Sequence, residues 1–124
     1  SYITAAVKTL FAPDTPPPAY AKTISAALIL RLPSLRANMA QVNALRAQLV
    51  AMQPRYAHLS LPMELLHGTA DTIVPIAVHS IPFAQQVASA HLHLIDGAGH
   101  MPHYSHRGEV LVAIARAEAR AALH

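Results

Sequence analysis

The chain of 124 residues contains no cysteine, so disulfide bonds, thiolate metal sites and a cysteine nucleophile are all excluded. Aromatic residues are scarce, at 5%, and the nine Lys and Arg side chains are scattered along the sequence. Nucleic acid is bound through basic patches and stacked aromatic rings, which this composition does not supply. We therefore expect no nucleic-acid partner.

Long apolar runs are also absent. The mostly apolar stretch at residues 24–30 is far shorter than the roughly 20 residues that a membrane span requires, and Arg31 closes it. The first residues include no initiator methionine and do not resemble the charged and then apolar layout of a signal peptide. We expect no membrane partner, a cytoplasmic location by default, and a chain whose start is cut from a longer protein.

Charged residues make up only 12% of the chain and hydrophobic residues 53%, with a mean hydropathy of +0.31. A disordered polar tail is excluded, and the length permits one core rather than two independent domains. All nine histidines and all four glycines follow residue 57. We therefore divide the chain into a segment at 1–57 and a second part at 58–124 that carries the chemistry.

The first segment shows the spacing of helices. Residues 2–11 predict one helix, and residues 19–32 predict a second, mostly buried helix that ends at Pro33. Ser34 is expected to cap a third helix. Its apolar side chains fall on one stripe that should be buried: Leu35, Met39, Val42, Leu45 and Leu49.

The second part changes period. Residues 63–67 and 91–95 predict strands, and residues 76–88 predict a helix that Pro82 kinks or begins. Ser105 is expected to cap a final helix that runs to residue 123. The side chains expected to face inward from it are Val110, Leu111, Ile114 and Ala117. The order strand, helix, strand, helix predicts an α/β fold with two parallel strands.

Asp71 and His100 each lie in a loop just beyond the carboxyl end of a predicted strand. Ligands bind at that edge of open parallel sheets, so we expect the two side chains to meet there. An acid that orients an imidazole, and a histidine that shuttles a proton, are two members of a hydrolytic triad. Gly97 and Gly99 flank the turn before His100 and can adopt backbone angles closed to other residues. The alternative is that Asp71 only stabilises a turn or caps the following helix.

Two stretches resemble loops of the α/β-hydrolase family. The acid loop is resembled by His67-Gly68-Thr69-Ala70-Asp71-Thr72-Ile73-Val74-Pro75, and the histidine loop by Gly97-Ala98-Gly99-His100-Met101-Pro102. The resemblance covers about residues 61–124, and segment 1–57 is similar only in kind to the variable helical cap of such enzymes. It implies the C-terminal portion of an α/β-hydrolase, with Asp71 as the triad acid, His100 as the general base, and no cofactor.

The resemblance also implies a small-molecule substrate, but esterases, lactonases, epoxide hydrolases and dehalogenases all share this arrangement of acid and histidine. The apolar character of segment 1–57 favours a small, hydrophobic substrate of ester or acyl type. Met101, His103 and Tyr104 would then line the mouth of the site or contact the cap. The family places its nucleophile, Ser or in some members Asp, upstream, and for Ser on a G-x-S-x-G elbow. None of the serines here has that setting. We therefore expect the nucleophile and the oxyanion donors to lie outside this chain, and the chain alone to be inactive.

Two other classes of function stay open. His100, His103 and His106 have the spacing H-x-x-H-x-x-H, and His91 and His93 share one strand face, which are patterns of a zinc site. We favour this less, because Met101-Pro102 makes the first gap a rigid loop. The other class is a non-catalytic assembly module. Two parallel strands leave open edges, so we expect self-association or pairing with a missing N-terminal part.

Overall fold

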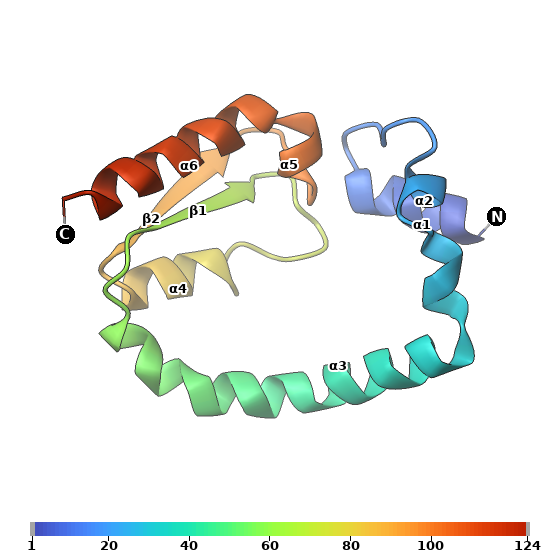
Figure 1. Cartoon of the computed structure of the whole chain (residues 1–124), viewed down its shortest axis with the longest axis horizontal. Coiled ribbons are helices and arrows are strands. Elements are labelled where there is room, and N and C mark those ends of the chain that lie inside the picture. The colour runs from blue at the N-terminus through green and yellow to red at the C-terminus, as the bar shows by residue number, and fades with distance from the viewer. Residues whose placement is uncertain (1, 124) are drawn as a thin grey trace.

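The computed structural model describes residues 2–123, so Ser1 and His124 lie outside the described residues. The elements follow the chain in the order α1 (Tyr2–Phe11), α2 (Tyr20–Thr23), the 3-10 helix η1 (Ala26–Leu30), α3 (Leu32–Met52), the 3-10 helix η2 (Gln53–His58), β1 (Met63–Gly68), α4 (Ser80–Gln86), β2 (Ala90–Ile95), α5 (Pro102–Ser105) and α6 (Arg107–Ala121). Figure 1 shows α3 running from the N-terminal helices to the α/β unit. The described part of the chain is mixed α/β, as predicted.

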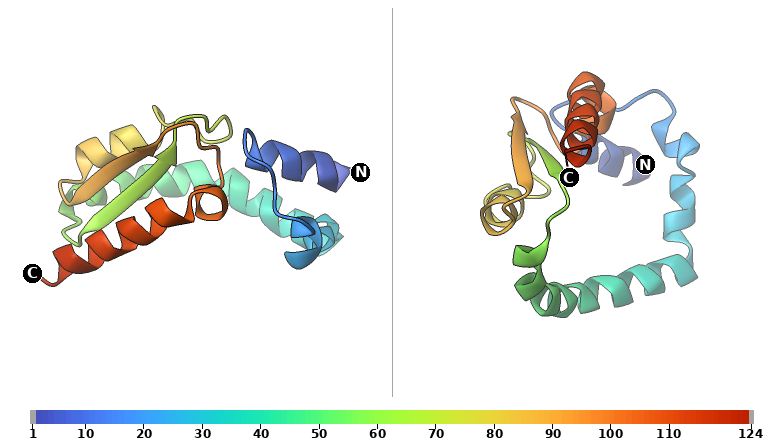
Figure 2. Two further views of the ribbon diagram at one scale, coloured as in Figure 1. Left: turned by 90° about the horizontal axis from the view of Figure 1, so that it is seen from above. Right: turned by 60° about the vertical axis from the view of Figure 1, so that its left-hand side comes forward.

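The sheet confirms the predicted pairing. β1 and β2 are parallel and in register from Met63 beside Ala90 to Gly68 beside Ile95. The crossover helix α4 covers one face of the sheet and α6 covers the other (Figure 2). Because side chains alternate along a strand, Glu64 on β1 faces α6, while its neighbour Leu65 faces α4. The carboxyl ends of both strands therefore reach one edge of the α/β unit together.

The prediction for residues 19–32 is wrong in both extent and burial. Residues 2–11 form α1 as predicted, but a single second helix does not form because Ala19 (φ 59°) and Ser25 (φ 51°) adopt left-handed backbone conformations. Ala19 directly precedes α2, and Ser25 separates α2 from η1. Leu28 and Ile29 in η1 are 54% and 56% exposed, so this stretch is not buried either.

Helix α3 begins earlier than predicted and buries nothing. Pro33 lies in its first turn, where a missing N–H removes no helical hydrogen bond, and Ser34 lies inside the helix rather than capping it. All five side chains of the predicted stripe are exposed, from 37% for Leu35 to 64% for Met39. The main contacts of α3 are with η1 and η2, its neighbours in the chain. The stripe is present, but no described element packs against it.

The two helices of the second part are shorter than predicted. α4 begins at Ser80, so Pro82 marks its first turn, which is one of the two predicted options. α6 begins at Arg107 after His106, and Ser105 does not cap it. Leu111 and Ile114 of α6 are 66% and 58% exposed, so the prediction that they face inward is wrong. Ala113 is the fully buried residue of that helix, because its small side chain allows close approach to the sheet.

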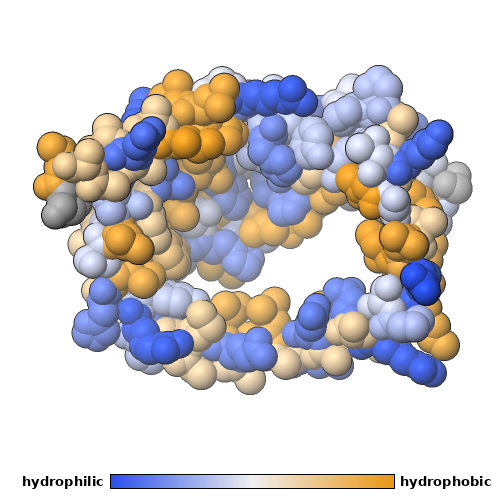
Figure 3. Space-filling model, in the orientation of Figure 1, coloured by the Kyte–Doolittle hydropathy of each residue, from blue (hydrophilic) through white to orange (hydrophobic). Residues whose placement is uncertain are grey.

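The N-terminal segment returns to contact the α/β unit. The rings of Phe11, Tyr20 and Tyr104 pack edge to face, with centroids 4.8 to 5.5 Å apart. A Cβ built on Gly99 would lie 2.0 Å from the carbonyl oxygen of Ala12, so the two backbones touch there. With α3 on the far side, the chain closes a ring, and Figure 3 shows an opening through it. In the described part of the chain, no helix has the length and apolar character needed to cross a membrane.

Candidate functional site

Asp71 closes the turn that follows β1. Its Oδ1 accepts hydrogen bonds from the backbone N–H groups of Ile73 (2.8 Å) and Val74 (3.0 Å), which hold residues 71–74 in a tight turn. The alternative function weighed for Asp71, stabilising a turn, is therefore present. The turn uses only Oδ1 of Asp71, so Oδ2 can bind another partner.

Oδ2 of Asp71 meets His100. The distance from Oδ2 to Nδ1 of His100 is 2.9 Å across 29 residues of sequence, which confirms the expectation that the two side chains approach at the carboxyl edge of the strands. The Asp71 side chain is 6% exposed and that of His100 is 30% exposed. An ionised carboxylate only accepts hydrogen bonds, so Nδ1 carries a proton and donates it to Oδ2. In the neutral ring, Nε2 then holds the lone pair.

Burial raises the pKa of Asp71, but donation from the Val74 backbone, the His100 side chain and the Ile73 backbone outweighs burial. The pKa of Asp71 therefore lies below its usual value, and the carboxylate is ionised at neutral pH. The ionised form also stabilises a protonated His100 ring. The pair can hold a proton on Nδ1 while Nε2 accepts a second one.

His67 also lies beside the Asp71 carboxylate, and its contacts were not predicted. It lies near the end of β1 and is buried, at 7% exposed. Nε2 lies 2.9 Å from the carbonyl oxygen of Val74 and 3.6 Å from Oδ2 of Asp71. Since a carbonyl can only accept, Nε2 carries the proton, and the Ser80 hydroxyl donates to Nδ1 at 2.6 Å. His67 therefore fastens the acid turn to the first residue of α4.

Glycines allow the two turns to touch. Gly97 has φ +70°, as predicted from its freedom of backbone angle. The prediction that Gly99 adopts a backbone angle closed to other residues is wrong, since its φ is not positive. Glycine is needed there because a side chain would collide with the backbone of Ala12. A Cβ on Gly68 would lie 2.2 Å from the carbonyl oxygen of Ala98. The acid turn and the histidine turn are therefore packed backbone against backbone.

The three residues predicted to line the site make different contacts. Tyr104 packs against Phe11 and Tyr20, so it lies at the contact with the N-terminal segment, and His103 is exposed with its ring 4.8 Å from that of Tyr104. Met101 is half-buried and precedes α5. Contact with a substrate stays a prediction for all three.

The histidines of the zinc alternative have different partners. His100 binds Asp71, His103 packs on Tyr104, and Nδ1 of His106 is 2.8 Å from the hydroxyl of Ser105. Among residues 2–123, no three His, Asp or Glu side chains are grouped to hold a metal ion.

Nε2 of His100 makes no hydrogen bond with any residue between 2 and 123. Two serine hydroxyls make hydrogen bonds away from this nitrogen: that of Ser80 binds His67, and that of Ser89 binds the carbonyl of Leu59. The free nitrogen is thus open to a group that this part of the chain does not supply. No protein-family model, curated protein or solved structure matches this chain.

Proposed function

We propose that this chain supplies the acid and the histidine of a hydrolase of the α/β-hydrolase type, with the nucleophile and the oxyanion donors supplied from outside the chain. The observation that carries the proposal is the 2.9 Å contact between Asp71 and His100 at the carboxyl edge of two parallel strands. Its further support is the resemblance of the two loops. The proposed compartment is the cytoplasm.

The chemistry follows from which ring nitrogen is free. Nε2 of His100 takes a proton from an attacking hydroxyl or water as the new bond to the acyl carbon forms. The ring becomes cationic, and the Asp71 carboxylate stabilises it through the proton on Nδ1. The same proton then passes from Nε2 to the leaving group. Asp71 stays ionised throughout, because the backbone donors of the turn hold its charge.

We propose a small, hydrophobic ester or acyl compound as substrate. The support is the apolar character of α3, whose Met39 and Val42 are 64% and 60% exposed. In the family that the two loops resemble, such a segment would face the substrate. A cap of this composition offers dispersion contacts and few charges, so it favours apolar groups beside the reacting carbonyl.

The test uses the reading frame that encodes this chain, expressed with any coding sequence upstream. The product should hydrolyse short-chain p-nitrophenyl esters, and His100→Ala should reduce kcat by about a thousandfold or more, since the base is lost. Asp71→Asn should cause a loss of similar kind. His58→Ala is the matched control, since His58 is exposed at the end of η2 and its ring makes no hydrogen bond within residues 2–123, and it should keep most of the activity. Equal effects of the two histidine substitutions, or no turnover of any ester by the unsubstituted product, would contradict the proposal.

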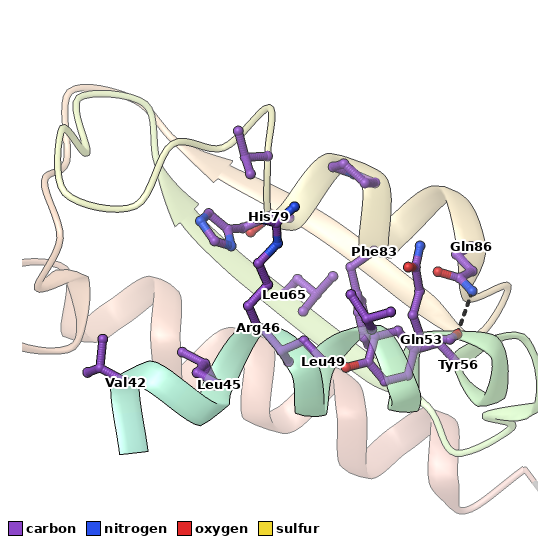
Figure 4. A pocket seen from close by; sticks show the side chains of 14 residues that line it. Val42, Leu45, Arg46, Leu49, Gln53, Tyr56, Leu65, His79, Phe83 and Gln86 are labelled. Atoms are coloured by element: carbon purple, nitrogen blue, oxygen red, sulfur yellow. Dashed lines mark hydrogen bonds between the residues drawn. The ribbon is translucent and has the colours of Figure 1, made fainter. Parts of the chain in front are cut away.

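A second candidate function, assembly, is favoured by one observation. A cavity of about 650 Å³ lies between α3 and α4, with Leu49, Leu65 and Phe83 directed into it (Figure 4). Neither Asp71 nor His100 lines it. Light scattering at micromolar concentration should show self-association if a second copy covers this surface. A stable monomer would remove the support for assembly and leave the hydrolase proposal unaffected.

A further inference from the structure

The hydroxyl of Thr69 joins the two turns that carry Asp71 and His100. The N–H of Gly97 donates to Oγ1 of Thr69 at 2.8 Å, and that hydroxyl donates to Oδ1 of Asp96 at 3.2 Å. Thr69 precedes Asp71 by two residues, and Gly97 precedes His100 by three. One side chain thus acts as acceptor and donor between the acid turn and the histidine turn.

The backbone around Thr69 shows why this contact matters. Thr69 N–H donates to the carbonyl of Ile95 at 3.0 Å, and Ala70 N–H donates to that of Ala98 at 2.9 Å. The backbone bonds therefore continue the pairing of the strands into the turns but leave out Gly97. At Gly97 the chain takes φ +70° and changes direction toward His100. The Thr69 hydroxyl is the group that holds the N–H of that residue.

Few other side chains could do this. Among residues 2–123, the side-chain hydrogen bonds between the two turns are those of Thr69 and the Asp71–His100 bond itself. Asp71 is fixed by its own backbone donors, whereas the histidine turn is held to the acid turn by Ala70 at Ala98 and by Thr69 at Gly97. If the turn at Gly97 shifts, Nδ1 of His100 moves away from Oδ2 of Asp71.

We propose that Thr69 is a positioning residue, which fixes the histidine turn so that Nδ1 of His100 faces Asp71. The inference rests on the proposed function, because only in that function does the face presented by the ring matter. The role needs a hydroxyl, since one atom must both accept from an N–H and donate to a carboxylate. Serine can replace threonine, and valine, of the same shape, cannot.

The test is nitrogen-15 NMR of the His100 ring in the full chain, at about pH 9, where imidazole is neutral. Thr69→Val should raise the rate of water exchange of the Nδ1 proton about fivefold, the factor that one exposed hydrogen bond contributes. Thr69→Ser should restore the slow rate. Thr72→Val is the matched control, since Thr72 is exposed in the same turn and its hydroxyl makes no hydrogen bond within residues 2–123. Thr69→Ala replaces Thr69→Val if the latter does not fold.

Asp71→Asn separates failure of this inference from failure of the proposed function. The backbone donors of Ile73 and Val74 would bind the amide oxygen, so the amide NH₂ would face His100 and the ring proton would move to Nε2. If Asp71→Asn leaves the proton on Nδ1, the acid and histidine pair fails, and both proposals fail with it. If Asp71→Asn moves the proton but Thr69→Val exchanges as slowly as Thr72→Val, only the role of Thr69 is overturned. A lower melting temperature with unchanged exchange has the same meaning, because it would show a structural role alone.

Discussion

Replacing Arg120 with methionine should destabilise the chain more than any other surface substitution on α6. The guanidinium donates from Nη1 to Oε1 of Glu64 (2.6 Å) and to the carbonyl of Met63 (3.1 Å), and from Nη2 to the carbonyl of Ser89 (2.6 Å). Met63 begins β1 and Ser89 directly precedes β2. One side chain therefore fastens the last turn of α6 to the start of both strands.

The size of the effect follows from burial. The Glu64 side chain is only 3% exposed, so removal of Arg120 leaves its carboxylate in a poorly solvated place. Breaking a buried ion pair by removing one partner costs about 3–5 kcal/mol. The His93 ring remains hydrogen-bonded to Oε2 of Glu64, which places the expected loss at the lower end, about 3 kcal/mol. That is a large fraction of the stability of a small domain.

Urea denaturation of the full chain measures this loss as a lower midpoint at unchanged slope. Arg116→Met is the matched control, because Arg116 lies one turn earlier on α6, and its contact at 3.1 Å is with the half-buried His93 ring rather than with the Glu64 carboxylate. It should cost at most about 0.5 kcal/mol. Adding Glu64→Gln to Arg120→Met should recover part of the loss, since the unpaired charge is then gone. A loss below about 1 kcal/mol for Arg120→Met would refute the reasoning.

Three further predictions test other parts of the molecule. Burial raises the pKa of Glu64, but hydrogen bonds from Arg120 and His93 outweigh burial, so the pKa of Glu64, like that of Asp71, lies below its usual value. The folding stability that both carboxylates contribute should be complete above about pH 5 and should decline as acid protonates them. Urea midpoints measured across pH should show a weaker decline in Glu64→Gln. Gly99→Ala should separate the N-terminal segment from the histidine turn and reduce the near-ultraviolet circular dichroism of the packed tyrosines, whereas Gly108→Ala, where a Cβ meets nothing within 4 Å, should not. The purified 124-residue chain should not hydrolyse p-nitrophenyl esters above background, because the proposed function places the nucleophile outside this chain. Turnover that His100→Ala abolishes would contradict this.

The local pattern of the sequence was sufficient for the sheet and for the acid and histidine pair. Residues 63–67 are a short run ended by Gly68, and residues 91–95 alternate His and Leu before Asp96-Gly97. Loops after parallel strands meet at one edge, so topology alone brings Asp71 and His100 together. Helix α3 shows the limit of the same reasoning. Periodicity identifies which side of a helix would be buried, but not whether an element is present to bury it.

The other contacts around Asp71 and His100 could not be predicted from the sequence, for a related reason. The bond from Ser80 to His67 depends on where α4 begins, and the bonds of Thr69 depend on the exact register of two turns. Neither quantity is encoded in residue spacing. The breaks at Ala19 and Ser25 are equally local, since alanine and serine in left-handed conformations carry no sequence signal.

The ring closed by the packing of residues 11–20 on the histidine turn has a consequence for the order of folding. β1 and β2 lie close together in sequence and can pair early, whereas the contact of Ala12 with Gly99 joins residues near opposite ends of the chain. Its loop-closure entropy is high, and few side chains compensate for it. The contact between Ala12 and Gly99 should therefore form last during folding and open first. Native-state hydrogen exchange should then show fast exchange of the amides of α1 and slow exchange of those in β1 and β2.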